Sequence, residues 1–147
     1  MRLNIAFVNS IPIFGGGEVW TLEAAKEMER RGHAAVVVCR EGAELKPRAE
    51  RAGVDVVEFP FGGDLDPLAI RRAARLLNKF LIDVVVANTD KDLRLFGLAS
   101  KFGGRAAIVA RKGVDRPLKN ALRYRLAYNR LASAVVANSE STKRTML

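Results

Sequence analysis

Cysteine, histidine and aromatic residues are scarce in this sequence of 147 residues. Cys39 is the only cysteine, so no disulfide can form within the chain. It ends the apolar run AAVVVC, which is typical of a buried strand residue rather than a nucleophile. Aromatic residues make up 7% of the sequence and are mostly core-like, with no stacking platform or recognised motif. We therefore expect no nucleic-acid partner.

Long apolar runs are also missing. No run approaches the about 20 residues that a helix needs to cross a bilayer. The start of the sequence lacks the basic and then apolar pattern of a signal peptide. These two absences predict a cytoplasmic protein.

Positive charge, by contrast, is abundant. Lysine and arginine outnumber the acidic residues by 25 to 16, which gives a formal net charge of +9. This charge indicates an anionic partner without saying which one. With 49% hydrophobic residues, the chain is long enough for one domain that buries roughly two thirds of its unfolded surface.

Short β-rich runs alternate with segments of helical periodicity along the chain. In the first helical segment, Trp20, Ala24 and Met28 share one face, and Glu23 and Glu27 lie on the other. The strand runs are almost continuously apolar, which suits parallel strands covered on both sides. The pattern predicts one Rossmann-like α/β domain, a doubly wound parallel sheet between two layers of helices. The predicted strands are Leu3–Val8, Ala35–Cys39, Val54–Phe59, Val84–Ala87, Ala106–Ala110 and Ala134–Ala137, and the predicted helices are Glu18–Arg31, Ala43–Ala52, Pro67–Phe80, Lys91–Phe102 and Pro117–Leu131.

Ligands of such sheets bind beyond the carboxyl ends of the strands, so the residues that follow each strand are the candidates for a site. In this sequence they are polar, partly basic and rich in small side chains. His33 lies in a turn at the opposite edge and is expected to be structural. The candidates are Asn9, Ser10 and the glycines after them, Arg40 and Glu41, residues 61–64, residues 88–90, Arg111 and Lys112, and residues 138–140.

Three consecutive glycines, Gly15, Gly16 and Gly17, open the first predicted helix. Glycine costs conformational entropy at this place, so the chain must require a bare backbone there. One explanation is a tight turn without a ligand. The other is an anion on the helix N-terminus, where free N–H groups and the helix dipole favour negative charge.

Two familiar glycine loops fit poorly. A P-loop requires lysine and then serine or threonine after its last glycine, but Glu18, Val19 and Trp20 stand here. A dinucleotide fingerprint requires a small residue at the position of Trp20, where helix and strand pack closely. Glu41 is the one feature that favours a ribose contact, and hence a dehydrogenase.

Both ends of the chain resemble the retaining glycosyltransferases of family 4. Near the start, a strand, a loop of several residues and GGGE open a helix that ends in RRGHAAVVV. At the end, LASAVVANSESTKRTML is similar to the strand-and-helix segment that closes the N-terminal domain of these enzymes. The expected number of β/α units lies between the two motifs, so the resemblance covers essentially the whole chain.

The resemblance implies a GT-B architecture, in which two Rossmann-like domains face each other across a cleft. It identifies residues 1–147 as the N-terminal, acceptor-side domain, with the C-terminal donor-binding domain absent from this chain. It implies sugar transfer from a nucleotide-sugar donor to a glycan or lipid-linked acceptor in cell-envelope polysaccharide or lipopolysaccharide biosynthesis, with no metal or bound cofactor. Because the paired-glutamate donor motif belongs to the absent domain, no catalytic residue is assigned here, and this fragment alone is expected to be inactive.

The resemblance also assigns residues to the two substrates. It places the backbone N–H groups of the three glycines near the donor diphosphate, where a side chain would fill the space of the phosphate oxygens. Many relatives carry a histidine after the fifth strand, where this chain has Arg111 and Lys112. Either the acceptor is anionic, or the reaction depends less on this position. The candidate acceptor contacts are Asn88, Arg94, Arg111 and Lys112.

Three further residues, Glu18, Asn138 and Glu140, border the implied cleft. Glu18 is equally suited to the positive end of the first helix. Thr89 or Asp90 is expected to cap the helix that follows the fourth strand.

The segment from residue 111 to residue 130 contains seven basic residues and one acidic residue. Four of the basic residues share a stripe on the predicted helix Pro117–Leu131 or lie at its edge. The stripe is either a solvated basic face or a contact with anionic lipid headgroups. Several lipid-acceptor relatives resemble this chain in having a basic, aromatic-containing helix at the same point of the domain. The second interpretation predicts a peripheral protein at the inner face of the plasma membrane, with a membrane contact made by Arg116, Lys119, Arg123 and Arg130.

A freestanding binding module is the alternative to an enzyme. Such a module would hold a phosphorylated or anionic ligand at the same sheet edge without catalysing a reaction.

Overall fold

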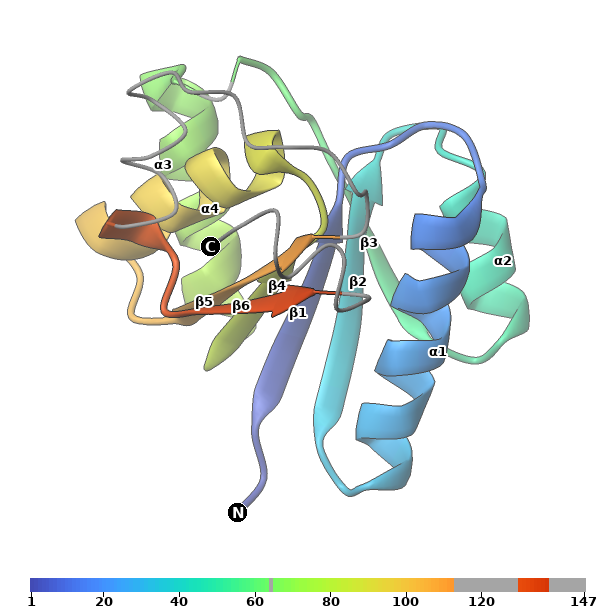
Figure 1. The fold of residues 1–147 in the computed structure, drawn as a ribbon. Coiled ribbons are helices and arrows are strands. Elements are labelled where there is room, and N and C mark those ends of the chain that lie inside the picture. The colour runs from blue at the N-terminus through green and yellow to red at the C-terminus, as the bar shows by residue number, and fades with distance from the viewer. Residues whose placement is uncertain (64, 113–129, 138–147) are drawn as a thin grey trace.

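Six parallel strands form one sheet in the order β3-β2-β1-β4-β5-β6 (Figure 1). The computed structural model describes residues 1–63, 65–112 and 130–137. The chain moves outward from β1 to β3 and then returns to β4 on the other side of β1, so the topological switch point lies between β1 and β4. This arrangement confirms the predicted doubly wound α/β fold. The strands are β1 (Asn4–Asn9), β2 (Ala34–Arg40), β3 (Asp55–Phe59), β4 (Val84–Ala87), β5 (Ala107–Lys112) and β6 (Ala134–Ala137), and the helices are α1 (Gly16–Arg30), α2 (Leu45–Arg51), α3 (Pro67–Lys79) and α4 (Asp90–Phe102).

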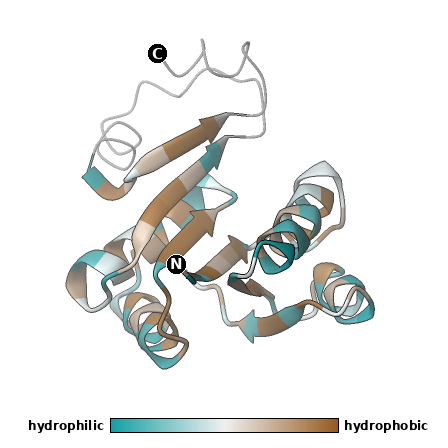
Figure 2. Cartoon of the chain, turned by 90° about the horizontal axis from the view of Figure 1, so that it is seen from below, coloured by the Kyte–Doolittle hydropathy of each residue, from teal (hydrophilic) through white to brown (hydrophobic). Residues whose placement is uncertain are grey.

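Apolar side chains leave the sheet on both faces and form two separate cores. Helices α1 and α2 cover one face, where Phe7 and Leu45 are buried. Helices α3 and α4 cover the other face, where Val85 and Phe96 are completely buried. Burial on both faces is the reason why the central strands are hydrophobic along their length (Figure 2). Cys39 lies in β2 and is completely buried in the first core, which confirms that it is a buried strand residue, and burial raises the pKa of its thiol to about 11.

The predicted elements are present wherever the structure describes the chain. Most ends differ from the prediction by one or two residues. Helix α2 begins at Leu45 rather than Ala43, because the Ala43 N–H donates to the Arg40 carbonyl in a turn and the Glu44 N–H donates to Pro12. The helix predicted over 117–131 lies outside the described residues except for its last two positions.

Capping groups fix the beginnings of two helices at the carboxyl edge of the sheet. Asp66 accepts a hydrogen bond from the Leu68 N–H at the start of α3, and Pro67 follows it in the first turn. Thr89 caps α4 through a 3.1 Å hydrogen bond from the Asp92 N–H to Thr89 Oγ1, as one of the two sequence alternatives predicted. No helix among the described residues is long and apolar enough to cross a membrane.

Candidate functional site

The glycine loop leads directly into α1 at the carboxyl end of β1. Gly15 is the N-cap residue, and Gly16 and Gly17 form the first turn. None of the three has a positive φ, and Gly15 has extended backbone at φ −150°. A tight left-handed turn therefore does not explain these glycines.

The space around the glycines gives a better explanation. A Cβ atom on Gly16 would meet nothing within 4 Å, whereas a Cβ on Gly17 would lie 3.3 Å from Asn88 Nδ2 and 3.5 Å from Arg111 Nη1. The first N–H groups of a helix have no partner inside it, and the N-cap residue Gly15 has no side chain that could accept from them. The positive end of the helix therefore faces open space on one side and a polar cluster on the other.

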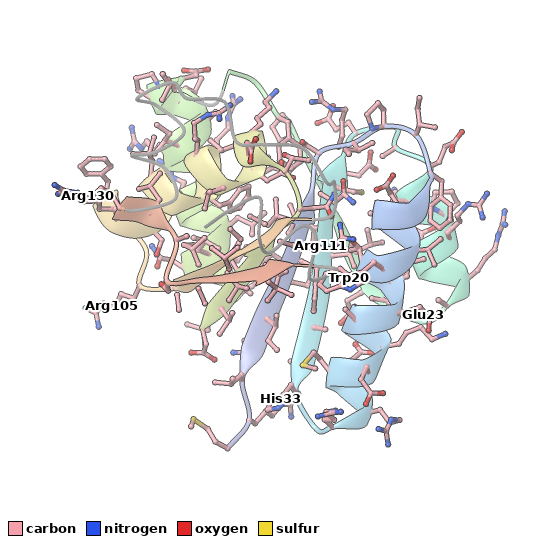
Figure 3. The ribbon with its side chains drawn as sticks, in the orientation of Figure 1. Trp20, Glu23, His33, Arg105, Arg111 and Arg130 are labelled. Atoms are coloured by element: carbon pink, nitrogen blue, oxygen red, sulfur yellow. The ribbon has the colours of Figure 1, made fainter. Side chains whose placement is uncertain are left out.

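Arg111 is the charged member of this cluster. It is the second-to-last residue of β5, at the carboxyl end of the strand, and only 7% of its surface is exposed. Its Nη1 donates a 2.7 Å hydrogen bond to Asn88 Oδ1, and its guanidinium lies 4.5 Å from the centre of the Trp20 ring. Figure 3 shows Arg111 and Trp20 side by side next to α1.

The charge of Arg111 is not neutralised by a direct ion pair with a described residue. The Nε atom is buried and has no hydrogen-bond partner among them. Burial lowers the pKa of Arg111, and the more distant Glu18 carboxylate opposes this shift. A buried guanidinium that lacks a contacting carboxylate is costly for the fold and suited to an anionic ligand.

Glu18 has a capping role in the structure. Only 4% of its surface is exposed, and its Oε1 accepts a 3.1 Å hydrogen bond from the Gly15 N–H. Its Oε2 accepts a 3.0 Å bond from the Asn9 side-chain amide. The Asn9 Oδ1 in turn accepts from the Ile11 N–H at 3.0 Å, which fixes the loop between β1 and α1. Both carboxylate oxygens of Glu18 are therefore engaged in shaping the loop.

A second buried carboxylate, Asp92, connects this loop to the turn after β4. Asp92 is completely buried, and its Oδ2 accepts a 3.2 Å hydrogen bond from the Ser10 N–H. Burial raises the pKa of Asp92 to about 6, although hydrogen bonds with Ser10 and Thr89 act against this shift. Its Oδ1 has no partner among the described residues. Sequence reasoning missed Asp92, although Thr89 to Asp92 fits the [ST]-x-x-[DE] pattern of a capping box.

Arg40 holds the same loop from the side of β2. Its Nε donates a 2.9 Å hydrogen bond to the Ser10 carbonyl, and its guanidinium lies 5.7 Å from the centre of the Phe61 ring. The sequence placed Arg40 at the binding edge without assigning it a role. With Asp92 on the N–H and Arg40 on the carbonyl, both backbone groups of Ser10 are fixed.

The sequence model of the family described as Glycosyltransferase Family 4 matches residues 14–147 of this chain. The chain belongs to glycosyltransferase family 4. The match begins at the residue before the glycines and covers every residue of the candidate site except Asn9, which ends β1, and Ser10, which follows it.

Solved structures share the fold of this family 4 chain, which is that of a GT-B glycosyltransferase domain. Anabaena HepE in complex with UDP is 24% identical and superposes with a TM-score of 0.79, over 99% of this chain and 40% of HepE. A glycosyltransferase from Rickettsia africae is 23% identical with a TM-score of 0.77, over 97% of this chain and 38% of that one. The lipopolysaccharide outer core galactosyltransferase WaaB is 15% identical with a TM-score of 0.70, over 97% of this chain and 41% of WaaB. This chain thus spans about 40% of the length of these proteins, and no curated protein matches it significantly.

The structure brings three of the sequence-predicted site residues into one cluster, namely Gly17, Asn88 and Arg111. Arg94 lies in the second turn of α4, where it is half-buried. Lys112 ends β5. Arg130 is exposed and lies away from Arg111 (Figure 3). Five other predicted contacts lie outside the described residues: Arg116, Lys119, Arg123, Asn138 and Glu140.

His33 lies at the other end of the sheet, as Figure 3 shows. Its Nδ1 accepts a 3.0 Å hydrogen bond from the Leu3 N–H, so it ties the beginning of β1 to the turn before β2. No group of three or more histidine, cysteine, aspartate or glutamate side chains that could hold a metal ion occurs within residues 1–63, 65–112 and 130–137.

Proposed function

We propose that this chain is the acceptor-side, N-terminal domain of a retaining glycosyltransferase that moves a sugar from a nucleotide-sugar donor to a glycan or lipid-linked acceptor. The observation that carries the proposal is the convergence of the α1 N-terminus, the Asn88 amide and the buried Arg111, which forms no ion pair with a described residue. Membership of family 4 and the likeness to HepE, which was crystallised with UDP and with UDP-glucose, support this class of donor.

The donor diphosphate lies over Gly15, Gly16 and Gly17 in this proposal. Phosphate oxygens accept hydrogen bonds from the free N–H groups of the first turn, and the helix dipole adds favourable electrostatics. A diphosphate gains negative charge as the bond to the sugar breaks, so preorganised donors there stabilise the transition state. Arg111 is close enough to Gly17 to contribute to the same stabilisation.

The acceptor enters from the side of β4 and β5. Asn88 holds an acceptor hydroxyl, and Arg94, Arg111 and Lys112 supply positive charge along its path. No nucleophile is assigned in this chain. The leaving phosphate itself assists the incoming hydroxyl, which suits a domain whose part is to position two substrates and stabilise charge.

The acceptor is a component of the cell envelope in this proposal. WaaB, which is named for the lipopolysaccharide outer core, supports this class of acceptor. Arg116, Lys119, Arg123 and Arg130 would hold the enzyme at the inner face of the plasma membrane, where lipid-linked acceptors are found.

The isolated chain provides the test. It should fold, transfer no sugar and bind nucleotide sugars only weakly, because one helix N-terminus supplies a small part of the contacts in a closed cleft. Isothermal titration calorimetry with a panel of nucleotide sugars measures this affinity. A micromolar or tighter dissociation constant would overturn the two-domain account. It would favour the freestanding binding module, for which the preassembled Arg111 site is the supporting observation.

A further inference from the structure

A groove of about 370 Å³ runs between the edge strand β3 and helix α3, outside the candidate site. Its floor is apolar and comes from both elements. Arginine and lysine side chains form the rest of the lining, so no side chain in the groove can accept a hydrogen bond. The lining residues are Val57, Phe59, Pro60, Arg72, Arg75, Leu76, Lys79 and Phe80.

Three of these residues, Arg72, Arg75 and Lys79, form what we call the α3 basic face. All three are exposed, and at about 100° per residue they fall within an arc of about 60°. Helix α3 contains no acidic residue between Pro67 and Lys79. None of the ion pairs in the described part of the chain involves the three cations.

The nearest acidic side chain of β3 does not neutralise this face. Glu58 alternates with Val57 and Phe59 along the strand, so its side chain leaves the sheet on the side of α2. There it pairs with Lys46 at 2.6 Å and accepts a hydrogen bond from the Gly42 N–H at 3.0 Å. The α3 basic face therefore has no carboxylate partner in the described part of the chain.

Exposed leucines accompany these cations. Leu68 is 51% exposed and lies on the same stripe of α3 as Arg72 and Arg75. Leu65 before the helix is 69% exposed, and Leu81 after it is 72% exposed. Large apolar side chains between unpaired cations are typical of a helix that lies in a membrane interface, with its apolar groups below the charged headgroups.

We propose that the α3 basic face binds an anionic phospholipid surface. Lipid phosphates accept hydrogen bonds from Arg72, Arg75 and Lys79, while Leu68 and the apolar floor of the groove contact the acyl region. The exposed side chains of Leu65, Leu68 and Leu81 favour a lipid surface over a purely acidic partner, which would leave them in contact with water. The proposal does not depend on sugar transfer, and it concerns the face of the sheet opposite α1 (Figure 1).

Vesicle binding of the full chain tests this assignment. The chain should sediment with vesicles of phosphatidylcholine and phosphatidylglycerol, but not with phosphatidylcholine alone. The triple variant Arg72→Gln/Arg75→Gln/Lys79→Gln should bind roughly 100-fold more weakly, since each basic residue near an anionic surface contributes about fivefold. The matched control Arg2→Gln/Lys26→Gln/Arg51→Gln removes the same charge at exposed positions away from α3 and should bind nearly as the parent does. Equal losses in both triple variants would overturn the proposal.

A label at Leu68 separates this face from any contact made by residues 113–129. Cys39 is completely buried, so a cysteine introduced by Leu68→Cys takes an environment-sensitive fluorophore selectively. Its emission should shift to shorter wavelength on binding, whereas a label at Val19→Cys on α1, a position 48% exposed, should not respond. No shift at position 68, or an equal shift at both positions, would overturn the proposal.

Discussion

The cluster around Arg111 and the α3 basic face both present positive charge, but they present it in opposite environments. Arg111 is 7% exposed, contacts Asn88 and Trp20, and sits beside a helix N-terminus. Arg72, Arg75 and Lys79 are exposed and lie along an open groove. A buried cation interacts strongly with one correctly placed anion, because water does not screen the interaction. Exposed cations act as a group, and salt weakens their attraction.

The two environments also differ in their cost to the fold. Burial of Arg111, which forms no ion pair with a described residue, costs free energy in the free domain, and a bound anion would recover part of this cost. The exposed cations cost little, because they remain hydrated. We therefore expect Arg111 alone to contribute strongly to the affinity for an anion. Each exposed cation of α3 should contribute little, and salt should weaken their combined contribution.

The largest effect is expected for Gly17→Val. The added side chain starts 3.3 Å from Asn88 Nδ2 and 3.5 Å from Arg111 Nη1, so it must displace the groups that form the site. Titration with UDP, followed by NMR chemical shifts, should show no response near Arg111. Gly16→Ala is the control for backbone conformation, because its Cβ meets nothing within 4 Å and its φ is not positive. That variant should keep the stability of the parent or gain up to about 1 kcal/mol.

Arg111→Gln should weaken UDP binding by about 10- to 100-fold, the loss of a charge-assisted hydrogen bond of about 1.5–3 kcal/mol. The free energy of unfolding should remain nearly unchanged, because losing the hydrogen bond to Asn88 and the contact with Trp20 offsets the gain from removing a buried charge. Thermal denaturation measures this second quantity. A large loss of stability with unchanged UDP affinity would mean that Arg111 serves the fold rather than a ligand.

Asp92→Asn extends the comparison to a buried carboxylate. The pKa of Asp92 is raised from 3.8 to about 6, so the folded protein binds this proton more tightly than the unfolded chain does. Ionisation therefore destabilises the fold, and the loss grows as the pH rises from about 4 to about 6. A shift of about two units corresponds to about 3 kcal/mol. In the Asn variant, the side-chain carbonyl accepts a weaker hydrogen bond from the Ser10 N–H than the carboxylate does. The stability gained by removing the buried charge is therefore smaller than this value.

The Asn variant should accordingly exceed the parent in stability by on the order of 1–2 kcal/mol at pH 7. This advantage should shrink as the pH falls towards 4. Urea denaturation of both proteins across this range measures the difference. A constant difference between pH 4 and pH 7 would show that Asp92 does not titrate in this window.

These buried charges mark the limit of what the sequence predicted. Nearly continuous apolar runs predicted the strands, and the rule for parallel sheets placed Asn88 and Arg111 at one edge. The sequence could not predict that Asp92 binds the Ser10 N–H, because 82 residues separate the two and only the crossover between β3 and β4 brings them together. It placed Trp20 on one face of the first helix and counted it against a dinucleotide fingerprint, but it did not predict that the ring packs against the Arg111 guanidinium. Contacts of this kind depend on register and side-chain direction, which periodicity does not specify.

The smallest effect is expected for Arg75→Gln, the exposed counterpart of Arg111→Gln. Glutamine and arginine have similar helix propensities, and Arg75 forms no ion pair among the described residues. The free energy of unfolding should stay within about 0.5 kcal/mol of the parent, and UDP affinity should not change. Binding to phosphatidylglycerol vesicles should fall by about fivefold, and added salt should reduce the difference between variant and parent. If Arg75→Gln lowered UDP affinity as much as Arg111→Gln does, the two basic regions would act through general electrostatics alone. The distinction between a buried site and an exposed face would then fail.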